Sequence, residues 1–133
     1  MKKGLCCLLI VIFAFVSLAY AATQVSNRIW KDTATGAVAL ATTVAPGVAW
    51  RLDSVRIHLS AAGAAGNLTA TVDAAAGGEY DAVVWSQDMT SVTDLVWFPE
   101  RDLIFTATDE LDFAWANAST RTYGLEVYYT KLN

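Results

Sequence analysis

The only histidine of the chain, His58, is the first residue to test for catalytic chemistry. A hydrolytic triad needs a histidine base beside its nucleophile and a carboxylate that orients the base. His58 stands in an alternating segment, 55–59, on the side opposite the apolar residues, so we expect it to face solvent from a strand. A zinc site is excluded too, because both cysteines, Cys6 and Cys7, lie in an N-terminal leader and a single histidine remains. We therefore expect a protein that is not an enzyme.

Acidic side chains suggest a second chemistry, the binding of calcium through loop oxygens. The densest acidic group is Asp109, Glu110 and Asp112. No EF-hand or calcium-binding nonapeptide pattern surrounds it. Most other acidic residues fall in predicted turns, where an aspartate bonds the local backbone. Calcium at these three residues is the one metal that the sequence leaves open, and no other cofactor is expected.

Aromatic residues form a third group, concentrated in the C-terminal half of the chain: Trp85, Trp97, Phe98, Trp115, Tyr128 and Tyr129. Neighbours in a strand point to opposite faces, so the adjacent pairs can each leave one ring exposed. Core packing, a protein interface and a platform that stacks on sugar rings are three uses of such residues. For the sugar-binding alternative, the candidate ligand-binding residues are Trp85, Trp97 and Trp115.

The charge of the chain excludes some partners. The net charge is −4, and it becomes about −6 once Lys2 and Lys3 leave with the leader. Basic residues are scattered rather than arranged in a stripe among aromatic residues, as phosphate binding would require. We expect neither nucleic acid nor an anionic membrane surface as a partner.

These side chains must be positioned by strands, because period-2 alternation recurs between short turn signals and helical spacing is absent after residue 22. Residues 32–36 are predicted to form a turn. The strongest segment, 49–60, slips by one residue at Asp53 and Ser54, which predicts a β-bulge. The predicted strands are 24–31, 37–44, 49–60, 67–73, 80–86, 92–98, 103–107, 111–115 and 123–132.

This spacing predicts an all-β fold: a single antiparallel β-sandwich, jelly-roll-like, with about eight strands, after an N-terminal signal helix. The leader has a basic start, an apolar run at 5–18 and small residues around a cleavage point before Ala22. We expect a signal peptide at 1–21 and the β-sandwich domain at 22–133, with an uncleaved anchor as the alternative. The mature domain would be periplasmic, extracellular or surface-associated, secreted without cysteines, and free of the membrane after cleavage.

Part of the domain resembles a known group of proteins. The similar segments are WRLDSVRIHLS at 50–60, LTATVD at 68–73, Tyr80 with Asp81, Asp109 to Leu111, and YGLEV at 123–127. These resemble small uncharacterised β-sandwich proteins encoded among tailed-phage and environmental viral structural genes. The resemblance implies a phage-like structural or surface role and carries no catalytic residues. A signal peptide is a departure from it, because a particle assembled in the cytoplasm does not need one.

Two functions of different classes follow. The first is a non-enzymatic exported structural or interaction protein, a subunit of a surface or virion-like assembly that self-associates or binds another structural protein. In one variant, the region 24–44 is donated to a neighbouring subunit. The alternative is an extracellular carbohydrate-binding module, which would take a glycan as its partner and use exposed tryptophan platforms.

Overall fold

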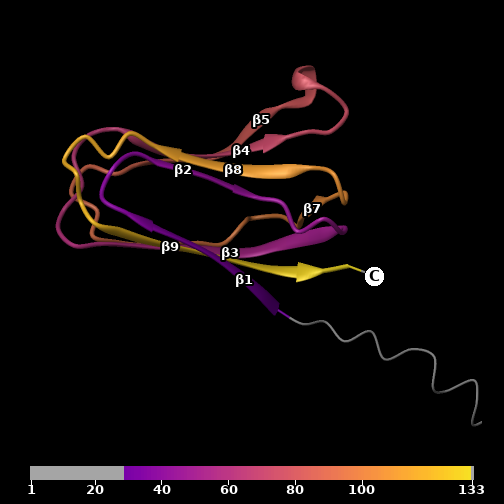
Figure 1. Ribbon diagram of the computed structural model, residues 1–133, viewed down its shortest axis with the longest axis horizontal. Coiled ribbons are helices and arrows are strands. Elements are labelled where there is room, and N and C mark those ends of the chain that lie inside the picture. Colours follow the sequence, from indigo (N-terminus) through magenta and orange to yellow (C-terminus); the bar gives the residue numbers. More distant parts are fainter. Residues whose placement is uncertain (1–28, 133) are drawn as a thin grey trace, which may run out of the picture.

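The computed structural model describes residues 29–132 and shows two antiparallel β-sheets packed face to face (Figure 1). The all-β sandwich expected from the alternation is therefore confirmed. The signal peptide predicted at 1–21 lies outside the described residues. Within the described part of the chain, no helix is long and apolar enough to cross a membrane.

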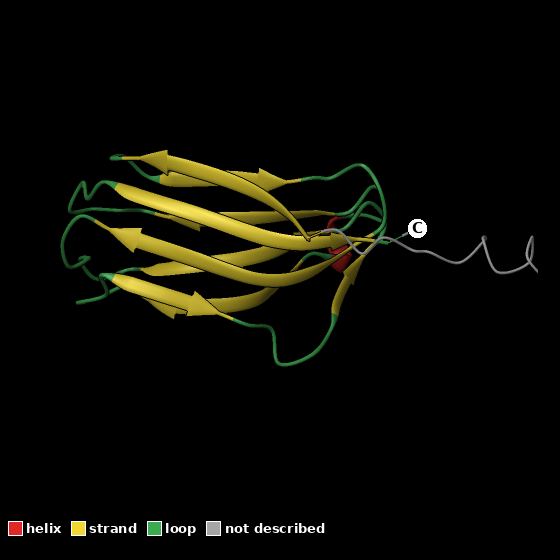
Figure 2. Cartoon of the chain, turned by 90° about the horizontal axis from the view of Figure 1, so that it is seen from below, coloured by secondary structure: helices red, strands yellow, loops and turns green. Residues whose placement is uncertain are grey.

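The strands match most of the predicted segments, and a 3₁₀ turn at Gly78–Tyr80 is the one helical element within 29–132. Most strands run along the long axis of the molecule (Figures 1 and 2). The strands are β1 (Ile29–Gly36), β2 (Leu40–Val44), β3 (Trp50–Leu59), β4 (Asn67–Asp73), β5 (Ala82–Asp88), β6 (Asp94–Trp97), β7 (Leu103–Phe105), β8 (Glu110–Trp115) and β9 (Tyr123–Lys131).

Each sheet combines strands from both ends of the chain. One sheet has the order β1-β9-β3-β6, with the short β7 also paired to β3, and the other has the order β2-β8-β4-β5. Neighbouring strands are antiparallel throughout. Strand β3 lies at the centre of the first sheet and therefore has neighbours on both sides.

The predicted turn at 32–36 is wrong, because these residues continue β1. Strand β1 pairs with β9 over its whole length, from Ile29 opposite Thr130 to Gly36 opposite Tyr123. The partner strand supplies the hydrogen bonds that the local sequence, rich in turn-forming residues, does not favour. Because β1 and β2 both pair within their own domain, the variant in which 24–44 is donated to a neighbour is wrong for residues 29–44.

The core lies between the sheets and is built from alternating inward-facing residues of both. Trp50 is fully buried and stacks on Phe105 with ring centroids 4.1 Å apart, and Tyr129 meets Trp50 edge-on at 5.5 Å. Leu111, Phe113 and Trp115 come from the facing sheet. This two-layer packing replaces the disulfides that the domain lacks.

The predicted bulge is present at Asp53. Leu52 is opposite Tyr129 and Ser54 is opposite Tyr128, so Asp53 is the extra residue in β3. Its carboxylate accepts hydrogen bonds from Arg51 Nε and Nη2, at 3.1 and 3.0 Å, and from Thr130 Oγ1 at 2.8 Å. Thr130 is only 3% exposed, so Asp53 satisfies a buried hydroxyl while holding the bulge.

The bulge sets which side chains face outward. A one-residue shift reverses the faces of a strand. Because of the shift at Asp53, Leu52 before the bulge and Val55 after it both face the core. Arg56 and His58 consequently face outward from the centre of the sheet.

Replacing Asp53 by Ala is expected to lower the free energy of unfolding by about 1–3 kcal/mol, because the buried Thr130 hydroxyl loses its acceptor. Urea unfolding followed by tryptophan fluorescence measures the change. In the D53A/T130V double variant the orphaned hydroxyl is gone, so part of the loss should be recovered. A double variant less stable than D53A would show that the Thr130 hydroxyl is not what Asp53 stabilises.

Candidate binding site

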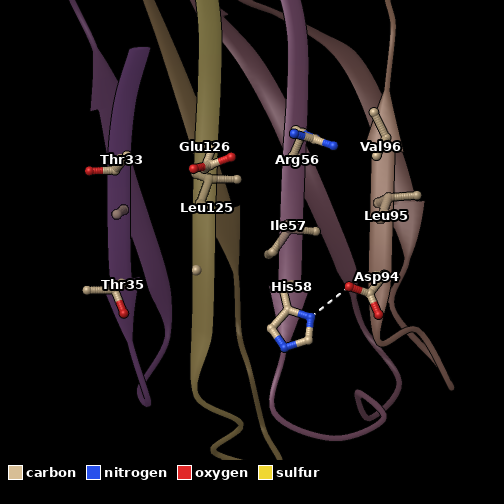
Figure 3. A pocket seen from close by; sticks show the side chains of 12 residues that line it. Thr33, Thr35, Arg56, Ile57, His58, Asp94, Leu95, Val96, Leu125 and Glu126 are labelled. Carbon is tan, nitrogen blue, oxygen red and sulfur yellow. Dashed lines mark hydrogen bonds and ion pairs between the residues drawn. The ribbon is translucent and has the colours of Figure 1, made fainter.

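The outer face of the β1-β9-β3-β6 sheet carries a hollow of about 460 Å³. Two rows of paired residues cross the four strands there, and residues opposite one another have Cβ atoms about 4.5–5.5 Å apart. From β1 to β6, the first row is Thr35, Gly124, His58 and Asp94, and the second is Thr33, Glu126, Arg56 and Val96. Figure 3 shows these side chains projecting from four adjacent strands.

Gly124 lies inside the first row and lines the hollow. The glycine is exposed, and a Cβ built on it would meet no atom within 4 Å. Its neighbours in the row are Thr35 and His58, which flank a position without a side chain. The inward-facing Ile57, Leu95 and Leu125 contribute to the floor between the polar walls.

His58 and Asp94 form the wall on the β3 and β6 side. His58 Nδ1 lies 2.6 Å from Asp94 Oδ1, and both side chains are about 70% exposed, at 70% and 71%. The hydrogen bond from His58 is the largest cause that lowers the pKa of Asp94. The outward position predicted for His58 is confirmed, and the carboxylate beside it comes from a strand that pairs with β3.

Glu126 forms part of the opposite wall and is held by two donors. Lys31 Nζ lies 2.8 Å from Glu126 Oε1, and the Tyr128 hydroxyl donates to Oε2 at 2.8 Å. The hydrogen bond from Lys31 is the largest cause that lowers the pKa of Glu126, and the same contact raises the pKa of Lys31. Glu126 is therefore an ionised acceptor at neutral pH.

A second hollow of about 470 Å³ continues along the same face. It is lined by Ser54, Arg56, Val96, Phe98 and Tyr128, so Arg56 and Val96 belong to both hollows. Phe98 is 67% exposed and gives this end an aromatic surface. The two hollows together form one outer-face site that is polar at the Gly124 end and more apolar at the Phe98 end.

The three tryptophans predicted to bind ligand do not line this site. Trp115 is 2% exposed in the core, so the prediction that it is a stacking platform is wrong. Trp85 and Trp97 are partly buried and stack on one another, with ring centroids 4.7 Å apart and planes 8° apart. This pair joins β5 of one sheet to β6 of the other, and each ring covers one face of its partner.

The predicted calcium ligands are also dispersed. Asp109 accepts backbone hydrogen bonds from Ala75 and Thr106, at 3.1 and 2.8 Å, and the bond from Thr106 is the largest cause that lowers its pKa. Asp112 accepts a hydrogen bond from the Thr43 hydroxyl, and Glu110 is in β8. In the part of the chain that the structure describes, no three acidic or histidine side chains are grouped as metal ligands. The Asp109 carboxylate instead accepts hydrogen bonds from the backbone of its own turn, at Thr106, and of the loop at Ala75.

Sequence reasoning missed the residues that make the hollow. Asp94 and Glu126 reach it through strand pairing, which local pattern does not specify. Gly124 did leave a local signal, because an isolated glycine inside a strand pattern marks a bulge or a close approach of another group.

No protein-family model matches the chain, and no curated protein matches it. The functional assignment rests on the geometry of the outer-face site.

Proposed function

We propose that the chain is an exported, non-enzymatic domain that binds a glycan at the outer-face site. Its leader would direct export, as expected for 1–21. With β7 set aside, the orders β1-β9-β3-β6 and β2-β8-β4-β5 are those of a jelly roll, and we infer that topology for the sandwich. Jelly rolls are common among lectin and viral capsid domains. The fold is therefore compatible with glycan binding but does not distinguish it from a structural role.

The observation that carries the proposal is Gly124. A glycine inside a strand costs about 0.5–1 kcal/mol relative to alanine, so its presence calls for a reason. Gly124 has no positive φ, and no neighbouring atom would clash with a Cβ. Gly63 is a contrast, because a Cβ there would lie 2.5 Å from the backbone oxygen of Met89. A strand glycine can also mark a place where a ligand approaches the backbone closely, and that is the use we propose for Gly124.

The lining of the hollow suits a molecule rich in hydroxyl groups. Threonine hydroxyls can donate and accept, carboxylates accept, and guanidinium donates, which together match the mixed requirements of sugar hydroxyls. A volume of about 460 Å³ lies within the usual range of small-molecule sites, about 300–1,000 Å³.

The arrangement favours binding over catalysis. A catalytic histidine of the triad type needs a nucleophile within hydrogen-bond reach. Among the described residues, the hydrogen bond of the His58 ring goes to Asp94. Thr35, the hydroxyl in the same row, donates to the Tyr123 carbonyl at 2.9 Å. His58 is therefore better suited to bind a ligand than to activate one.

Self-association is the second candidate, as a subunit of a cellular surface assembly or a virion-like one. Its supporting observation is β1, an edge strand whose residues Ile29 and Trp30 are 69% and 43% exposed. An open edge can pair with another copy. The charged residues Lys31 and Asp32 follow directly, and charges on an edge strand oppose such pairing. We rank this candidate below glycan binding for that reason.

Gly124→Val is expected to abolish glycan binding while leaving the domain folded. A Cβ at this position would meet no atom within 4 Å, the valine side chain would project into the hollow, and valine favours a strand. A glycan array followed by calorimetry on the mature domain should show at least about a tenfold loss of affinity, equal to about 1.4 kcal/mol. The melting temperature should stay the same or rise.

Ala114→Val is the matched control, because Ala114 is exposed on the outer face of the other sheet. This variant should bind as the wild type does. A wild-type domain that binds no glycan, or a G124V variant that binds as tightly as the wild type, would contradict glycan binding in the hollow.

The self-association candidate predicts a concentration-dependent increase in mass in size-exclusion chromatography with light scattering. Trp30→Asp should then shift the protein toward the monomer, because it adds charge to the exposed edge. A wild-type domain that remains monomeric across the concentration series would eliminate self-association.

A further inference from the structure

Arg56 is the charged residue of the outer-face site that lacks a partner. Lys31 is paired with Glu126 and His58 with Asp94, at 2.8 and 2.6 Å. Among residues 29–132, Arg56 makes no hydrogen bond or ion pair, although it stands directly opposite Glu126 and Val96 in the sheet. Its charge lowers the pKa of Glu126 only as a minor cause, after the two hydrogen bonds.

The position of Arg56 is as informative as its charge. It lies in the central strand and lines both the Gly124 hollow and the Phe98 hollow. A ligand long enough to occupy both hollows must therefore pass over its guanidinium group. The side chain is exposed and has all of its donors available for such a ligand.

The other charged side chains of the face already have partners. Lys31 and Glu126 cancel one another, and His58 stabilises the ionised form of Asp94. Among the described residues that line the two hollows, Arg56 is therefore the charged side chain without a hydrogen-bond or ion-pair partner. A guanidinium group binds a carboxylate through two parallel hydrogen bonds and binds it more strongly than a neutral hydroxyl.

We propose that the ligand of the outer-face site is a saccharide that carries a carboxylate, recognised by Arg56. This inference rests on the proposed glycan-binding function and specifies the class of glycan. The hydroxyl groups of the sugar occupy the Gly124 hollow, and the adjacent ring lies toward Phe98. The acidic net charge of the whole chain opposes such a ligand only weakly at contact, because physiological salt screens exposed charges beyond about 8 Å.

The test compares acidic saccharides with neutral counterparts of the same rings. An oligogalacturonate is paired with its methyl ester, and sialyllactose is paired with lactose. In calorimetric titrations of the mature domain, the acidic member of at least one pair should bind at least about tenfold more tightly than its neutral counterpart. Raising the salt concentration should weaken the binding of the acidic member more than that of the neutral one.

Arg56→Gln should remove the preference for the acidic member, and it should weaken binding of the neutral member much less, because the charge-assisted hydrogen bonds to the carboxylate are the stronger ones. Arg101→Gln is the matched control, since it removes the same charge from an exposed turn after β6, outside both hollows. This control should bind as the wild type does. Equal affinity for both members of each pair, or an acidic preference that survives Arg56→Gln, would overturn the inference.

The two proposals fail in different ways. If acidic and neutral members bind equally and Gly124→Val abolishes both, glycan binding stands and recognition of a carboxylate is wrong. If the wild-type domain binds neither member of either pair, recognition of an acidic saccharide is overturned, and the neutral glycans of the array then decide the proposed function separately.

Discussion

The single extra residue in β3 is the constraint on which the rest of the structure depends. Without Asp53, one half of the central strand would present its apolar residues to solvent, because the side chains of a strand alternate between faces. The shift lets both halves contribute to one core, and the same shift directs Arg56 and His58 outward. The hydrogen bond from buried Thr130 ties this local irregularity to the neighbouring strand. The core and the outer-face site thus depend on the same bulge.

The outer-face site is assembled from strands that are far apart in the sequence. Strand β9 brings Gly124 and Glu126 between β1 and β3, and β6 brings Asp94 to His58. The result is a polar surface in which Lys31 is paired with Glu126 and His58 with Asp94 before a ligand arrives. Such preorganisation lowers the cost of ordering side chains on binding. Gly124 leaves the centre of the outer-face site without a side chain. Arg56 is the charged side chain of the site that has no partner among the described residues.

The sequence predicted what depends on local alternation. The strand 49–60, its bulge and the outward position of His58 were all contained in the pattern of apolar and polar residues. The predictions that failed concern residues whose surroundings come from distant parts of the sequence. Strand β1 covers residues expected to turn, because β9 supplies its hydrogen bonds. Trp115 is buried because it shares the inward face of β8 with Leu111 and Phe113 and packs in the core between the sheets. The acidic group at 109–112 is used for turn and side-chain hydrogen bonds rather than gathered around a metal. The importance of Gly124 emerged only once its neighbours across the sheet were known.

The most direct test of the account is a nuclear magnetic resonance titration of the labelled mature domain with an oligogalacturonate and sialyllactose. Backbone amide shifts report where a ligand contacts the domain, independently of any substitution. Binding at the outer-face site predicts saturable shifts at Gly124, Arg56 and His58, with little change at Thr69 and Ala114 on the outer face of the other sheet. Saturable shifts confined to the surroundings of Trp85 and Trp97, or no shifts with either ligand, would contradict it.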